Sequence, residues 1–136
     1  MQTKEYYEEL CSAYNHNNPF ANAVGVQITS CCDGHAEAEV VIEEQHINTI
    51  QTVHGGVAYT LADTVTGCAA RSRGQRCTTI EGKVNYIRAA SGRDHKLIGK
   101  ADVIHFGRKT IVLTVDITNE AGKLIAKGLF TYYVLD

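Results

Sequence analysis

Two glycines stand at the start of a segment of small and apolar residues. His54-Gly55-Gly56 ends a loop, and residues 55–70, GGVAYTLADTVTGCAA, have the length and composition of a helix. Glycine disfavours helix formation, because it loses the most backbone entropy on folding. A helix N-terminus carries unpaired N–H groups and a partial positive charge, and glycine lets a ligand approach them closely. The pair therefore predicts a site that polarises a carbonyl and stabilises an oxyanion. The alternative is that the glycines only permit tight helix–strand packing.

Asp63 is the only charged residue in this expected helix. A helix that is apolar or small nearly all round should be buried. A buried carboxylate lowers stability unless it is paired or neutralised, and proteins tend to keep such groups for function. Asp63 is therefore a candidate functional residue, and the alternative is a structural hydrogen bond to a neighbouring strand.

The distance between these two features predicts a shared site. At a rise of 1.5 Å per residue, Asp63 lies roughly 12 Å along the helix axis from Gly55. Residues so far apart cannot serve one small reaction centre within a single chain. If two such helices run antiparallel across a twofold interface, the N-terminus of one faces the middle of the other, and two composite sites form.

Alternating apolar residues on both sides of the helix predict strands. Val24, Val26 and Ile28 share a face of the first strand, and Asp33-Gly34 predicts a hairpin turn into the second. Gly-containing turns connect the segments after the helix as in an antiparallel meander. The apolar residues expected on one face of each later strand are Ala36, Ala38, Val40 and Ile42; Ile80, Val84 and Tyr86; Leu97, Ala101 and Val103; Ile111, Leu113, Val115 and Ile117; and Leu124, Ala126, Phe130, Tyr132 and Val134.

The order of these elements predicts an α+β fold, in which an antiparallel sheet with one polar face wraps one central helix with the other. Residues 1–136 form a single domain, because two domains would each be too small to hold a core. Residues 1–20 form an N-terminal helical extension, with a short helix over 3–14 ended by the breaker residues 15–19. Strand edges and one flank of the central helix would stay uncovered, so we expect at least a dimer.

Composition excludes several classes of protein. Thirteen Lys and Arg against fifteen Asp and Glu give a net charge of −2, which argues against nucleic acid as a partner. No apolar run approaches the roughly 18 residues of a membrane span, and the start, MQTKEYYEEL, lacks the basic and then apolar regions of a signal peptide. Five cysteines without CxxC spacing fit reduced thiols. We expect a cytoplasmic protein that binds no membrane.

The pattern of Asn48, His54-Gly55-Gly56 and Leu61-Ala62-Asp63-Thr64 resembles the hotdog-fold acyl-CoA thioesterases of the PaaI-like, or phenylacetate-pathway, type. In that family an Asn lies six residues before a His-Gly-Gly triplet, and an Asp follows nine residues after the His. Both spacings match here, and the strand layout extends the resemblance over residues 20–134. The family's usual Gly three residues before the His is Gln51 in this chain.

The resemblance implies hydrolysis of an acyl-CoA thioester to a free acid and coenzyme A. Asp63 would act as nucleophile or as general base on water, and the Gly55 N–H of the partner chain would polarise the thioester carbonyl. Asn48 and His54 would shape the loop and position the thioester or water. Thr79 matches a family Ser or Thr and would orient the water or Asp63. No catalytic metal or separate cofactor is implied, because coenzyme A belongs to the substrate.

The expected partners are the acyl-CoA substrate and further copies of the chain, as a dimer or a tetramer built of dimers. Coenzyme A carries several phosphate charges, and the candidates to bind them are Arg88, Arg108 and Lys109. One alternative is a non-catalytic hotdog protein that binds acyl-CoA, although the retained Asp63 argues against it. A hotdog hydratase for enoyl thioesters would need an Asp and His pair around an Asn-Pro segment, and no Pro follows Pro19.

Overall fold

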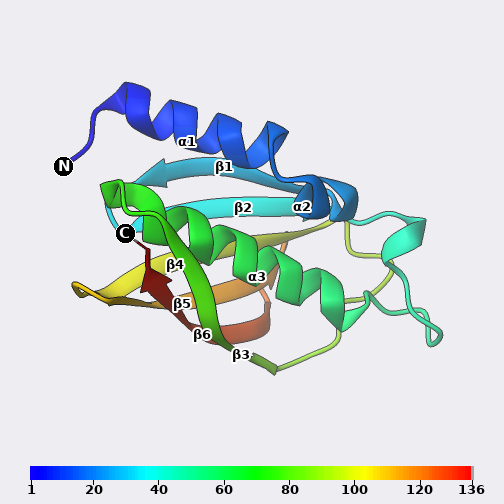
Figure 1. The fold of residues 1–136 in the computed structure, drawn as a ribbon. Helices are drawn as coiled ribbons and strands as arrows, with labels where there is room; N and C mark the ends of the chain where they lie inside the picture. The colour runs from blue at the N-terminus through cyan, green and yellow to red at the C-terminus, as the bar shows by residue number, and fades with distance from the viewer. Residues whose placement is uncertain (136) are drawn as a thin grey trace.

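The computed structural model describes residues 1–135, which contain three α-helices and six strands (Figure 1). The helices are α1 (Lys4–His16), α2 (Pro19–Val24) and α3 (Gly55–Ala70). The strands are β1 (Val26–Cys32), β2 (His35–Val41), β3 (Cys77–Tyr86), β4 (Lys96–Phe106), β5 (Thr110–Asn119) and β6 (Leu124–Val134). None of the described helices is long and apolar enough to cross a membrane.

The strands form one antiparallel sheet in the order β1-β2-β4-β5-β6-β3. The sheet curves around α3, which packs against one of its faces (Figure 1). This arrangement confirms the predicted α+β fold with one central helix. The Asp33-Gly34 turn joins β1 to β2 as predicted, and Gly34 takes the left-handed conformation with φ of 72°.

Helix α3 has the predicted bounds and forms the centre of the core. Leu61 and Val65 of α3 are fully buried, as are Leu113 of β5 and Phe130 of β6. Gly67 lies where the helix meets two tyrosine hydroxyls, and a Cβ there would be only 3.0 Å from Tyr14 and 3.2 Å from Tyr132. The glycine that weakens the helix in isolation is therefore needed for close packing.

Strand β3 departs from simple alternation. The ladder between β3 and β6 shifts its register between Thr79 and Glu81, so Ile80 sits at a β-bulge and is 57% exposed. The prediction that Ile80 shares a face with Val84 is therefore wrong, because the extra residue reverses the alternation. The bulge brings Thr79 onto the side of the strand that faces α3.

The first 25 residues are more helical than predicted. Helix α1 begins after Thr3, whose hydroxyl accepts a hydrogen bond from the Tyr6 N–H, and it continues to His16. A second helix, α2, then starts at Pro19, because proline is tolerated at the first helical position. Val24 ends this helix rather than starting β1, which corrects the predicted strand face.

The two edges of the sheet are covered differently. Helix α1 lies along β1 (Figure 1), and the Asn15 side chain makes two hydrogen bonds to the backbone of Ile28. No strand among residues 1–135 pairs with the outer side of β3. Exposed apolar side chains accompany this open edge, including Tyr86 and Ile87, which are 52% and 55% exposed.

Candidate active site

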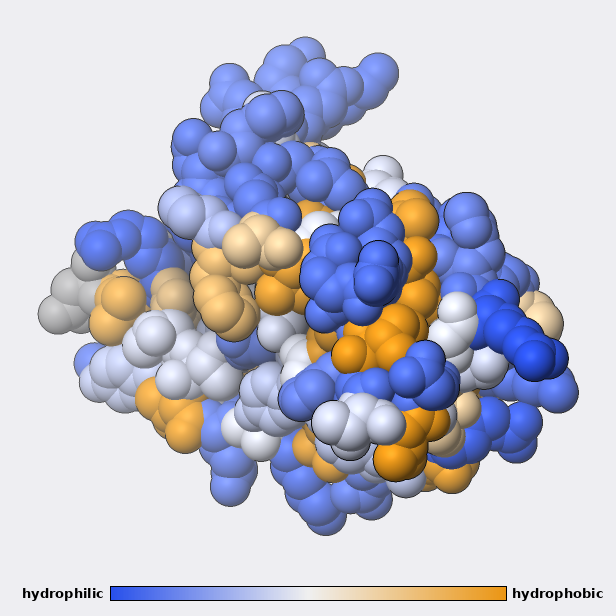
Figure 2. Space-filling view, turned by 90° about the vertical axis from the view of Figure 1, so that its right-hand side faces the viewer, coloured by the Kyte–Doolittle hydropathy of each residue, from blue (hydrophilic) through white to orange (hydrophobic). Residues whose placement is uncertain are grey.

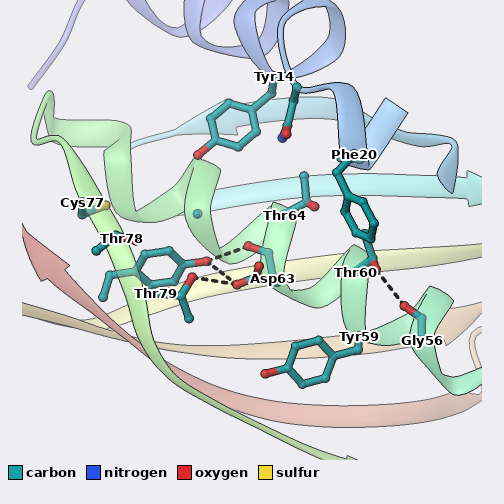
Figure 3. A pocket seen from close by; sticks show the side chains of 14 residues that line it. Tyr14, Phe20, Gly56, Tyr59, Thr60, Asp63, Thr64, Cys77, Thr78 and Thr79 are labelled. Carbon is teal, nitrogen blue, oxygen red and sulfur yellow. Dashed lines mark hydrogen bonds between the residues drawn. The ribbon is translucent and has the colours of Figure 1, made fainter. Parts of the chain in front are cut away.

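A cavity of about 580 Å³ lies where α3 meets the N-terminal helices and the start of β3 (Figure 3). Its wall combines aromatic rings with hydroxyl groups, and among the described residues that line it Asp63 alone is charged. The residues that line it are Tyr14, Asn18, Phe20, Ala21, Gly56, Tyr59, Thr60, Asp63, Thr64, Gly67, Cys77, Thr78, Thr79 and Tyr132. An apolar cavity with a few convergent polar groups is the usual form of a ligand site.

The Asp63 carboxylate is held by one of its two oxygens. The Thr79 hydroxyl donates a hydrogen bond of 2.8 Å to Asp63 Oδ1, and the Tyr132 hydroxyl lies 3.2 Å from the same atom. The second oxygen, Oδ2, receives no hydrogen bond from any residue in 1–135. The hydrogen bonds to Oδ1 therefore fix the orientation of the carboxylate and leave Oδ2 open to another partner (Figure 3).

The Tyr132 hydroxyl contacts both the backbone and the side chain of Asp63. Its hydroxyl donates to the Asp63 carbonyl oxygen at 2.6 Å and contacts the Thr66 hydroxyl at 2.8 Å. Burial, and next the negative charge of Asp63, raise the pKa of Tyr132, so its hydroxyl stays protonated and able to donate. The sequence places Tyr132 only on a core face. A clue to its contact with Asp63 is that a buried tyrosine hydroxyl needs a hydrogen-bond partner.

The start of α3 presents one free backbone donor. His54 caps the helix, and its Nδ1 accepts the Gly56 N–H at 2.8 Å. The Tyr86 hydroxyl donates to the Gly55 carbonyl oxygen at 2.7 Å. Among the described residues no acceptor takes the Gly55 N–H. The geometry thus keeps this N–H available at the positive end of the helix.

A second pocket, of about 350 Å³, opens beside Gly55. Its wall is largely apolar and includes Tyr86, Ile87 and Arg88 together with His54. Figure 2 views the end of the molecule where α3 begins, and hydrophobic residues gather at the centre of that end between hydrophilic margins. The free donor therefore lies in apolar surroundings, where a hydrogen bond to a developing charge is strong.

Asn48 organises the loop that leads to this donor. Its Oδ1 accepts the N–H groups of Ile50 and Thr52 at 3.0 Å each, and its Nδ2 donates to the Thr52 hydroxyl at 2.8 Å. Gln51, at the usual glycine position of the family, takes a left-handed conformation with φ of 65°. Asn48 lines neither of the two pockets. Within one chain it therefore shapes the loop.

The structure gathers the candidate residues into two groups. Thr79 contacts Asp63, and His54 adjoins Gly55, while the two groups stand at different turns of α3. The basic candidates are also separated. The Arg88 N–H, just after β3, donates to the Ile125 carbonyl oxygen at the start of β6. The Lys109 carbonyl oxygen accepts from the Val134 N–H at the opposite end of β6. Arg108 lies beside Lys109 in the turn before β5, so one chain does not bring the three together.

This combination of sheet and helix is the hotdog fold. The solved structure of Escherichia coli PaaI, from the phenylacetic acid degradation operon, superposes with a TM-score of 0.89, covers 95% of this chain and 93% of its own, and is 27% identical. The sequence profile of the thioesterase superfamily matches residues 50–126. The chain belongs to that superfamily, and the enzyme class it defines is thioester hydrolase.

Two relatives extend the match over most of the chain. Human acyl-coenzyme A thioesterase 13 is 31% identical over 131 residues, which is 93% of this chain and 92% of the relative. A hypothetical thioesterase from Streptococcus pneumoniae TIGR4, solved with coenzyme A, is 30% identical with a TM-score of 0.81. It covers 89% of this chain and 96% of its own.

Proposed function

We propose that the chain hydrolyses an acyl-CoA thioester at a site shared by two copies. The observation that carries this proposal is the Asp63 carboxylate, which is held by Thr79 through Oδ1 and has Oδ2 free in an aromatic cavity. The relative solved with coenzyme A and the relative named as an acyl-coenzyme A thioesterase support this substrate class.

In the proposed reaction, the free Gly55 N–H of the second copy donates to the thioester carbonyl oxygen. This polarises the carbonyl and stabilises the negative charge that develops when it is attacked. Asp63 Oδ2 either attacks the carbonyl carbon, forming an anhydride that water then hydrolyses, or takes a proton from the attacking water. In both routes the carbon–sulfur bond breaks, and the coenzyme A thiolate leaves and takes up a proton. Thr79 and Tyr132 keep the free oxygen aimed at the cavity.

The outer side of β3 is the surface where we expect the second copy to dock. A twofold axis across this edge would pair two β3 strands antiparallel and continue the sheet from one copy into the next. The exposed Ile80 and Tyr86 side chains would then be covered. The same axis would set the two α3 helices antiparallel, which brings Gly55 of one copy toward Asp63 of the other.

Arg88 is the basic residue best placed for the coenzyme A phosphates. It lines the pocket that contains Gly55, so it stands near the entrance through which the thioester would reach the free donor. An Arg guanidinium binds phosphate through paired hydrogen bonds. Arg108 and Lys109 would reach the same molecule only if another copy brought their turn to it.

A panel of acyl-CoA thioesters tests the proposal. Loss of thioester absorbance is the appropriate readout, because the five cysteines of the chain would react with a thiol reagent. We expect turnover of at least one thioester, and we expect Asp63→Ala to lower kcat by about 10² to 10⁴ while the protein remains folded. The control is Asp116→Ala, which removes an exposed carboxylate on the other face of the sheet. Binding of acyl-CoA without turnover would instead favour a non-catalytic binding protein.

A further inference from the structure

Another hollow, distinct from the pocket beside Gly55, adjoins the Asp63 cavity. It has a volume of about 350 Å³ and lies between α2, the start of α3 and the loop that follows β2. Phe20 of α2 and Gly56 and Thr60 of α3 line both this α2–α3 hollow and the Asp63 cavity. The rest of its wall consists of Ala23, Val24, Gln45, His46, Ile47, His54 and Val57. The proposed hydrolysis takes place at Asp63 and assigns no role to this hollow.

The Phe20 side chain stands between the two spaces. It points from α2 toward Thr60 (Figure 3), and 70% of its surface is exposed. The next residue, Ala21, is buried and anchors α2 on the core. On the opposite side, the Thr60 hydroxyl donates to the Gly56 carbonyl oxygen at 2.8 Å, which fixes this part of the wall. The backbone that carries the ring is therefore held in place, and the ring has open space on both sides.

The other end of the Asp63 cavity is closed. Gly67 lies one turn of α3 beyond Asp63, whereas Thr60 lies about one turn before it. A Cβ on Gly67 would be 3.0 Å from the Tyr14 hydroxyl and 3.2 Å from the Tyr132 hydroxyl, so there is no room for a further methyl group at this end. A hydrocarbon tail that is bound beside Asp63 must therefore extend toward Phe20 as it becomes longer.

The α2–α3 hollow suits a hydrocarbon tail better than a polar one. His46 Nδ1 accepts the Glu43 N–H at 2.9 Å, so its Nε2 carries the proton and donates to the Val24 carbonyl oxygen at 2.5 Å. His54 Nδ1 is occupied by the Gly56 N–H. The pantetheine arm of coenzyme A contains amide groups, which lose free energy when they are buried without hydrogen-bond partners. Methylene groups, in contrast, gain free energy from burial in such a place.

We propose, on the basis of the proposed hydrolysis of an acyl-CoA thioester, that Phe20 determines the acyl-chain length that the enzyme accepts. A short acyl group fills the Asp63 cavity up to the Phe20 ring, and the end of a longer straight chain meets the ring. Removal of the ring joins the cavity to the α2–α3 hollow and gives a longer tail an apolar place to bind. Phe20 is thus a specificity-determining residue that takes no part in bond breaking.

The test measures kcat/KM for saturated straight-chain thioesters from butanoyl-CoA to hexadecanoyl-CoA, below their micelle concentrations, by loss of thioester absorbance. Phe20→Ala should move the optimum to longer chains, and Phe20→Trp should move it to shorter ones. Each methylene that becomes buried contributes about fourfold. The ratio of kcat/KM between thioesters longer and shorter than the original optimum should therefore rise about tenfold or more in Phe20→Ala. The control Ile104→Ala removes a 61% exposed side chain that lines neither space, and it should leave the length profile unchanged.

A second variant tests whether the α2–α3 hollow receives the tail. Ala23 is an exposed residue of α2 that lines this hollow but not the Asp63 cavity. Ala23→Trp should fill the hollow, so its combination with Phe20→Ala should cancel the gain for longer chains. Melting temperatures verify that each variant is folded. A double variant that keeps the full gain would contradict binding of the tail in this hollow.

A binding measurement separates this inference from the proposed function. Calorimetry on Asp63→Ala, with and without Phe20→Ala, gives dissociation constants for the same thioesters without turnover. If the unaltered chain hydrolyses no thioester, the proposed function fails, and the dissociation constants still show whether Phe20 limits chain length. The inference is overturned if Phe20→Ala leaves the length profiles of turnover and binding unchanged. It is also overturned if all chain lengths lose activity together as dimers dissociate, which would make Phe20 an interface residue.

Discussion

The two edges of the sheet differ in whether the chain covers the outer side of the edge strand. At β1, the chain covers its own edge: α1 lies along the strand and Asn15 bonds both backbone groups of Ile28. At β3, the outer backbone has no partner strand among residues 1–135, and Ile80 projects from a bulge with 57% of its surface exposed. Unpaired strand edges promote association, and proteins normally protect them. In the proposed dimer, one edge is closed for stability and the other is left open for assembly.

The open edge also holds residues that contact the proposed catalytic groups. Thr79, which orients Asp63, belongs to β3, and Tyr86 of the same strand bonds the Gly55 carbonyl oxygen. By contrast, the covered edge contributes only Thr29, Ser30 and Cys31 to a groove beneath α1. The comparison therefore predicts that changes at β3 alter turnover and that changes at β1 alter mainly stability.

After Asp63→Ala, the largest effect on kcat should come from the donor at the start of α3. Gly55→Pro deletes one backbone N–H at a position where proline is tolerated in a helix, and losing one oxyanion donor costs about a hundredfold in kcat. Gly55→Ala is the matched control, because its Cβ would meet the same Tyr86 ring at 3.3 Å while the N–H is kept. Equal activity of the two variants in steady-state assays would mean that the donor lies elsewhere.

A charge at the open edge should give the next largest effect. Ile80→Glu would place two carboxylates near the twofold axis, and we expect the dimer to dissociate at concentrations at least tenfold higher than for the unaltered chain. Turnover should fall in parallel as dimer is lost. Gln27→Glu makes a similar change on β1 and should leave both properties unchanged. Sedimentation velocity measures the assembly, and a variant that stays dimeric with Glu at 80 would contradict docking along β3.

A change at the covered edge should lower the stability of the protein without lowering its activity. Asn15→Ala removes two hydrogen bonds to Ile28, at about 1 kcal/mol each, so the free energy of unfolding should fall by about 2 kcal/mol. The kcat should change less than twofold, because Asn15 touches neither pocket. Chemical denaturation and steady-state assays on the same sample separate the two effects. A large loss of activity in a fully folded Asn15→Ala variant would contradict the distinction between the two edges.

The sequence predicts the central helix and the isolated carboxylate but not the contrast between the two edges, and these limits have physical causes. The bounds of α3 and the isolation of Asp63 follow from local composition, which is why both were predictable. The bulge at Ile80 was not, since period-two alternation assumes a regular ladder and a bulge depends on the partner strand. Asn15 reads as a helix breaker, although α1 continues past it and its side chain pairs with a strand thirteen residues away.

The site shows the same difference between local features, which the sequence predicts, and long-range contacts, which it does not. The Asn48, His54 and Gly55 spacing located the loop and the helix start correctly, because these residues act within a few positions of one another. The contact between Tyr132 and Asp63 is not predicted by the sequence, because it joins residues 69 positions apart. Local chemistry can be read from spacing, whereas long-range contacts require the fold.

The most direct test of a site shared across β3 is complementation between two inactive variants. Asp63→Ala and Gly55→Pro are mixed under conditions that allow subunits to exchange, and heterodimers are verified by native mass spectrometry. In a heterodimer one site receives both defects and the other receives neither. Random exchange makes about half of the dimers mixed, each with one intact site of two, so about a quarter of the unaltered activity should return. Heterodimers that remain as inactive as their parents would contradict the shared site.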